Sequence, residues 1–98
     1  MANAVEFASF NLKKEASVSE FLLVSDRFNS VFLTTQKGYI SRKLLRDGEM
    51  WADSVLWETK EDVHKAYKNV DEDAAACEYL SFMDKESIKV LLPVERIY

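Results

Sequence analysis

A β-hairpin that runs directly into a helix start is encoded in residues 37–65, and it constrains the fold more than any other part of the chain. Asp47-Gly48 lies there between two runs rich in Ile, Leu, Val, Trp and Tyr. Asp-Gly suits a two-residue type I′ turn because both central residues of that turn need positive φ. The turn predicts a strand register in which Arg42 lies directly opposite Asp53.

This register divides the hairpin into two faces, because side chains alternate along a strand. One face is bulky and, apart from one pair of opposite charges, apolar; it carries Ile40, Arg42, Leu44, Trp51, Asp53, Val55 and Trp57. The other face is smaller and mixed; it carries Tyr39, Ser41, Lys43, Leu45, Met50, Ala52, Ser54 and Leu56. Neither face has the polar composition of a surface that is exposed to solvent. We expect the tryptophan face to be covered by the chain's own helices and the mixed face by a second subunit.

Capping and periodicity signals predict the remaining elements. Ser17-Val-Ser-Glu20 is a capping box, and apolar residues at helical spacing follow it. The predicted order is a strand over residues 4–11, a helix from Ser17 that ends before Gly38, the hairpin, a helical piece that begins at Thr59, another that Asp71-Glu-Asp73 can cap, and a strand over residues 87–98. Pro93 in this last strand marks an edge position, a bulge or the place where the strand leaves its own sheet. This βαββαβ order predicts an α+β, ferredoxin-like fold with a four-stranded antiparallel sheet and the helices on one face.

Composition restricts the classes of partner. A chain of 98 residues, 48% of them hydrophobic, with two Gly and one Pro, is expected to form one globular domain over residues 1–98. Its formal net charge of −4 argues against nucleic acid or an anionic membrane as a partner, and no apolar run is long enough to span a bilayer. The single cysteine, Cys77, excludes an internal disulfide and a cysteine-cluster metal site, so we expect a cytoplasmic protein.

The open sheet face predicts self-association. Half-apolar residues such as Tyr39, Leu45, Met50 and Leu56 rarely stay exposed on a small protein. Two sheets packed face to face would bury them in a homodimer with two-fold symmetry. The alternative is a monomer with a mixed, wet sheet face.

The hairpin also carries a family resemblance. Gly38-Tyr-Ile-Ser, the Leu-Leu pair, the Asp-Gly turn and the run from Trp51 to Thr59 resemble the central segment of small dimeric α/β-barrel proteins similar to the antibiotic-biosynthesis monooxygenases. The resemblance implies a homodimer whose two sheets form a barrel, with a cavity between helices and sheet in each subunit. Some members oxidise small aromatic compounds there with molecular oxygen, without metal or flavin, and others bind and degrade haem.

The haem-degrading members have an Asn on the first strand, a Trp at the end of the third and a His in the second helical region. Trp57 matches the Trp, whereas Ala8 stands near the place of the Asn. The region that would hold the His lies near Tyr79, and the only histidine, His64, comes too early in the chain. We therefore predict no cofactor.

Arg42 and Asp53 are the first candidates for chemistry. Asp53 beside aromatic rings could act as a base or orient a phenolic substrate, and the alternative is a structural cross-strand salt bridge of roughly 0.2–1 kcal/mol. His64 is a candidate acid or base, or else a partly exposed helix residue. Large aromatic residues could line a substrate pocket, although core packing is their commoner role; they are Trp51, Trp57, Phe28, Tyr67 and Tyr79.

Two classes of function therefore remain open. The first is a cofactor-independent oxygenase or isomerase that acts on a small aromatic or polyketide-like molecule, with Asp53, Arg42 and His64 as its polar groups. The second is a non-catalytic dimer that binds a small ligand or serves as an interaction module. A sheet face that binds nucleic acid is disfavoured, because basic and aromatic residues do not alternate on any strand.

Overall fold

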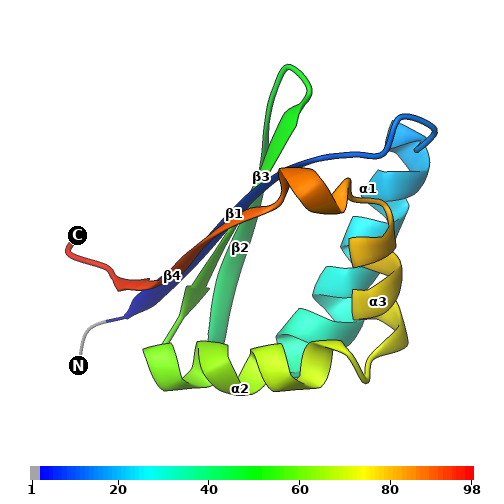
Figure 1. Ribbon diagram of the computed structural model, residues 1–98. Coiled ribbons are helices and arrows are strands. Elements are labelled where there is room, and N and C mark those ends of the chain that lie inside the picture. Colours follow the sequence, from blue (N-terminus) through cyan, green and yellow to red (C-terminus); the bar gives the residue numbers. More distant parts are fainter. Residues whose placement is uncertain (1–2) are drawn as a thin grey trace.

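The computed structural model describes residues 3–98, apart from the side chain of Leu92, and its elements follow the predicted order. They are β1 (Ala4–Asn11), α1 (Val18–Arg27), β2 (Tyr39–Asp47), β3 (Met50–Trp57), α2 (Lys60–Val70), α3 (Ala74–Ser81) and β4 (Lys89–Glu95). The sheet has the strand order β2-β3-β1-β4, and all neighbours are antiparallel. Figure 1 shows the helices gathered on one side of this sheet. The predicted ferredoxin-like α+β fold is confirmed.

The three helices begin where the sequence predicts. Each N-cap side chain accepts a hydrogen bond from the backbone N–H three residues later: Ser17 from Glu20, Thr59 from Asp62 and Asp73 from Ala76. The acidic turn before Asp73 separates the last two helices, so that α2 crosses the end of the sheet while α3 packs beside α1 (Figure 1). The space between helices and sheet is thus enclosed on two sides.

The helix predicted to reach Gly38 changes character before it ends. After α1 the chain forms a π-helical turn, Phe28–Phe32, and then a short 3₁₀ turn, Leu33–Thr35. Gly38 has the expected positive φ, +87°. It is also a point of close approach, because a Cβ there would lie 2.1 Å from Oδ2 of Asp62 on α2. Glycine at this position lets the first turn of α2 pack against the start of the hairpin.

The hairpin turn differs from the prediction. Asp47 pairs with Met50, so the two central residues of the turn are Gly48 and Glu49 rather than Asp47 and Gly48. Only Gly48 has positive φ, +61°, which is the pattern of a type II′ turn with glycine in its first central position. Gly48 is compatible with either turn, and the structure forms the type II′ turn.

The predicted strand register is therefore wrong by two residues. Arg42 lies opposite Val55, and Asp53 lies opposite Leu44, so the two charged residues are diagonal rather than direct neighbours. From Ser41 to Trp57, a shift of two keeps the side chains on their predicted faces, because the period of a strand is two. Arg42 and Asp53 consequently still meet on the side of the sheet that the helices cover.

Two residues at the start of β2 are on the opposite faces from those predicted. The register slips between Tyr39 and Ser41, which is a β-bulge, and Ile40 is left 43% exposed. Tyr39 instead lies on the helix side, where its ring contacts Trp57 edge to face and its hydroxyl donates a 3.1 Å hydrogen bond to Asn29. The bulge moves an aromatic side chain from the open face to the covered one.

The last strand is shorter than predicted. A 3₁₀ turn, Lys85–Ser87, precedes β4, and the strand ends at Glu95. Between the pairs Phe7 with Leu91 and Val5 with Val94, β4 contains one extra residue next to Pro93. β4 is an edge strand, so two of the three alternatives that the sequence allows for Pro93 are found here, an edge and a bulge.

The core lies between helices and sheet. Its largest fully buried side chains are those of Trp57, Tyr79, Phe10, Phe21, Phe32 and Val63. On the opposite sheet face Leu45, Met50, Leu91 and Val94 are 43–56% exposed. Within residues 3–98, every helix is too short or too polar to cross a membrane.

Candidate functional site

A cavity of about 320 Å³ lies between the sheet and the helices. This volume falls at the lower end of the range for small-molecule sites. The lining is mostly apolar; it comprises Glu6, Ala8, Phe10, Phe28, Phe32, Leu33, Asp53, Val55, Trp57, Ala66, Tyr67, Val70, Asp71, Tyr79, Leu80, Met83, Ile88 and Val90. The most exposed of these, Tyr67, Asp71 and Val90, mark the mouth of the cavity between α2 and β4.

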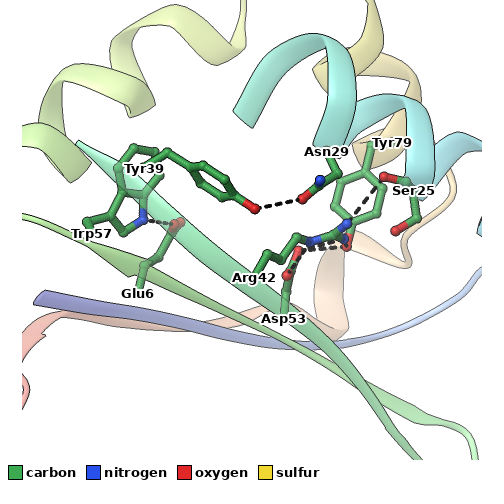
Figure 2. A network of polar contacts seen from close by, with 8 residues as sticks. All are labelled: Glu6, Ser25, Asn29, Tyr39, Arg42, Asp53, Trp57 and Tyr79. Carbon is green, nitrogen blue, oxygen red and sulfur yellow. Dashed lines mark hydrogen bonds and ion pairs between the residues drawn. The ribbon is translucent and has the colours of Figure 1, made fainter. Parts of the chain in front are cut away.

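The closed end of the cavity holds an ion pair. Arg42 donates to both oxygens of Asp53, from Nε to Oδ1 at 2.8 Å and from Nη2 to Oδ2 at 3.1 Å. Arg42 also donates to the backbone oxygen of Ser25 on α1 and to the hydroxyl of Tyr79 on α3, and that hydroxyl donates to Asp53 Oδ2 at 2.8 Å. Figure 2 shows these four residues converging from the sheet and from two helices.

Burial makes this ion pair different from a surface salt bridge. The side chains of Arg42 and Asp53 are only 7% and 10% exposed. Burial acts to lower the pKa of Arg42, but the hydrogen bonds and charge of Asp53 outweigh it and raise that pKa above its ordinary value. Burial and the charge of Asp53 raise the pKa of the Tyr79 hydroxyl, which therefore remains a proton donor at neutral pH. The cluster is a buried unit held together by hydrogen bonds among Arg42, Asp53 and Tyr79.

Asp53 keeps room for one more partner. A carboxylate offers about four acceptor sites, and Arg42 and Tyr79 together use three of them. Asp53 also lines the cavity, whereas Arg42 does not. The remaining lone pair can accept a hydrogen bond from a ligand hydroxyl, while the two donors hold the carboxylate in place.

A second polar group stands nearer the mouth. The indole Nε1 of Trp57 donates a 3.2 Å hydrogen bond to Oε1 of Glu6, and Figure 2 shows this pair apart from the Arg42 cluster. Burial raises the pKa of the Glu6 carboxyl, the charge of Asp53 adds to the effect, and hydrogen bonds from Tyr67 and Trp57 oppose it. Burial also raises the pKa of the Tyr67 hydroxyl. Of these two carboxylates, Asp53 has a cation beside it and Glu6 forms no ion pair with a described lysine or arginine.

The structure brings together most of the residues that the sequence singles out. Asp53, Phe28, Trp57, Tyr67 and Tyr79 all line the cavity. Trp51 is buried outside the lining, where its ring contacts Phe21 at 5.1 Å between centroids. His64 is exposed on α2 and does not reach the cavity. Within residues 3–98, no three His, Cys, Asp or Glu side chains gather to hold a metal ion.

Sequence reasoning missed Glu6 and Ala8. Both lie on the cavity face of β1, and Ala8 pairs with Asp53 on one side and with Val90 on the other, at the floor of the cavity. The signal was present, because alternation places a lone acidic residue and a small one on the same face as Phe10. Ala8 leaves space that a larger side chain would fill.

Comparison with solved structures supports the fold. SnoaB, a cofactor-independent oxygenase from Streptomyces nogalater, matches with a TM-score of 0.78 and 14% identity over 100% of this chain and 96% of that one. A protein proposed to be an antibiotic biosynthesis monooxygenase from Bordetella bronchiseptica matches with a TM-score of 0.73 and 15% identity over the whole of both chains. A third, from Nitrosomonas europaea and proposed to have the same role, matches with a TM-score of 0.72 and 14% identity over 99% and 92%.

Neither a family model nor a curated protein matches the sequence. At 14–15% identity the likeness is one of fold, and it extends over nearly the full length of each chain compared. The resemblance seen in the hairpin is thus confirmed in three dimensions. The chain has the ferredoxin-like fold of the antibiotic-biosynthesis-monooxygenase-like proteins.

Proposed function

We propose that the protein binds a small aromatic or polyketide-like molecule in the cavity between its helices and its sheet, and oxidises it with molecular oxygen without a cofactor. The observation that carries this proposal is the cavity itself. It has the size of a ligand site and an aromatic lining, and Asp53 is held at its closed end by Arg42 and Tyr79. The fold shared with a cofactor-independent oxygenase agrees with it.

The chemistry needs a substrate that supplies its own electrons. In an anthrone, a CH₂ group between two rings carries an acidic proton, and in this proposal Asp53, which lines the cavity, accepts that proton through its remaining lone pair. The resulting anion reacts with oxygen, one oxygen atom stays as a new carbonyl, and the other leaves as water. The CH₂ group provides the four electrons and the two protons, so no external reductant enters the balance.

The polar residues have unequal parts in this scheme. Asp53 contacts the substrate, and Arg42 and Tyr79 hold its carboxylate in place through their hydrogen bonds. The role predicted for His64 stays a prediction that the cavity does not support, because this residue is exposed on α2. Trp57 and Phe28 supply apolar surface for the rings of the substrate.

Oxygen uptake with anthrone tests the proposal. The wild-type protein, treated with a chelator, is expected to consume oxygen and to place one labelled atom from ¹⁸O₂ in the quinone product. Asp53→Asn should remain folded and lose this activity, while Glu49→Gln at the exposed hairpin tip should keep it. Binding without oxygen uptake would favour the non-catalytic alternative, and the absence of both binding and uptake would overturn the whole proposal.

We further propose that the protein is a homodimer that pairs through its open sheet face, in a cytoplasmic setting. The apolar side chains exposed there support the pairing, namely Leu45, Met50, Leu91 and Val94, with Val5 and Phe7 half-buried beside them. Size-exclusion chromatography with light scattering should give twice the mass of the chain. Leu45→Lys should give the monomer mass, and a wild-type monomer at all concentrations would contradict the pairing.

A further inference from the structure

The charges around the cavity are all of one sign. Three lining residues are acidic, Glu6, Asp53 and Asp71, and among residues 3–98 neither lysine nor arginine contributes to the lining. Arg42 neutralises Asp53 from outside the cavity. Of the two remaining acidic groups, Glu6 is partly buried and Asp71 is exposed at the mouth, and both favour positive charge on a ligand near that end. Near the mouth, an anionic group of a ligand would be repelled and a cationic group would be attracted.

The aromatic rings of the cavity favour the same charge. Six lining residues carry rings: Phe10, Phe28, Phe32, Trp57, Tyr67 and Tyr79. At the closed end the guanidinium carbon of Arg42 lies 5.3 Å from the ring centre of Phe28 and 5.2 Å from that of Tyr79. These distances are within the range of cation–π attraction. One cation of the protein is thus already held by the combination of a carboxylate and ring faces.

Glu6 offers the same combination near the mouth, without the cation. It accepts a hydrogen bond from Trp57 and lies close to Tyr67, but none of the described lysine or arginine side chains pairs with it. Burying a carboxylate without a cation is costly, and Glu6 responds by holding its proton more tightly. An ammonium group supplied by a ligand would stabilise the ionised form of Glu6.

We propose that the cavity selects an aromatic amine in its protonated form, with the ammonium group bound by Glu6 beside Trp57 and Tyr67 and the ring directed toward Tyr79. Ala8 separates Glu6 from the closed end on the same face of β1 and leaves room for the ring. This inference rests on the proposed function that the cavity binds a small aromatic molecule, and it adds the charge of that molecule.

Three probes with the same ring test the inference. At pH 7, 1-naphthylmethylamine is a cation, 1-naphthylmethanol is neutral and 1-naphthoic acid is an anion. Calorimetric titration of the wild-type protein should give a Kd for the amine at least about tenfold lower than for the alcohol, with the acid weakest of the three. Glu6→Gln should reduce the preference for the amine over the alcohol to less than about threefold.

The control variant is Glu49→Gln, which removes the same charge at the exposed hairpin tip and should keep the wild-type preference. Circular dichroism shows whether Glu6→Gln is folded, and saturable binding of the alcohol shows that its cavity still takes up the ring. If the alcohol binds the wild-type protein as tightly as the amine, or if Glu6→Gln keeps the preference, the inference is wrong and the binding function stands. If none of the three probes binds, the proposed function itself fails.

Discussion

The buried pair of Arg42 and Asp53 allows the sharpest stability prediction. Truncating Asp53 to alanine would leave a guanidinium that is 7% exposed without its counter-charge, although Ser25 and Tyr79 would still accept hydrogen bonds from it. Removing one partner of a buried ion pair costs about 3–5 kcal/mol, and the remaining acceptors favour the lower value. For a domain of this size, about 3 kcal/mol corresponds to a fall in Tm of at least about 12 °C.

Urea denaturation followed by tryptophan fluorescence measures this cost, since both tryptophans are buried in the folded state. The matched control is Glu78→Ala, which breaks the exposed pair of Arg27 and Glu78 and should cost no more than about 1 kcal/mol. The double variant Arg42→Met with Asp53→Leu removes both charges and should recover most of the stability. A loss below about 1 kcal/mol for Asp53→Ala would show that the pair is as weak as an exposed one, and would refute the reasoning.

Three further predictions concern the backbone, the pH dependence and the cavity. Gly38→Ala should lower the free energy of unfolding by clearly more than Gly48→Ala, because both positions have positive φ but only a Cβ at Gly38 would collide with Asp62. Urea denaturation of the two variants compares their free energies of unfolding. The raised pKa of Glu6 means that the folded state holds this proton more tightly than the unfolded state, so this contribution to stability is complete below pH 4.5 and is lost as the pH rises through the folded pKa. Glu6→Gln should therefore flatten that part of the curve of unfolding free energy against pH. An unchanged curve would contradict the assignment. Ala8→Leu should fill the cavity floor and weaken the binding of 1-naphthylmethanol at least about tenfold. Circular dichroism should show an intact fold. An unchanged affinity would place the ligand elsewhere.

The sequence predicts the fold well because its signals are local and agree with one another. Three N-caps, one alternating strand and one glycine turn are enough to order the elements, and each N-cap is confirmed. The hairpin shows why an error in strand register did not change the faces on which the key side chains lie. Gly48 could serve as either central residue of the turn, and the two choices differ by two residues, which leaves the faces of Arg42 and Asp53 unchanged.

Other features could not be predicted, because they depend on contacts between distant elements. The bulge that turns Tyr39 inward has no local signature beyond the nearby Gly38, and it is stabilised by Asn29 and Trp57. A cavity is a place where packing is incomplete, and residue patterns do not encode how completely neighbouring side chains fill space. Glu6 is the exception, since an acidic residue on an otherwise apolar strand face is visible in the sequence and indicates a site that needs a partner.

The central claim is that the space between Trp57 and Tyr79 is a ligand site, and a nuclear magnetic resonance titration of the ¹⁵N-labelled protein with 1-naphthylmethanol tests it most directly. We predict saturable shifts of the Trp57 indole signal and of the Ala8 and Ala66 amides, all of which belong to cavity-lining residues. The signals of the exposed sheet face, such as that of Leu45, should stay in place. Shifts confined to that sheet face, or no shifts up to millimolar probe, would contradict the account.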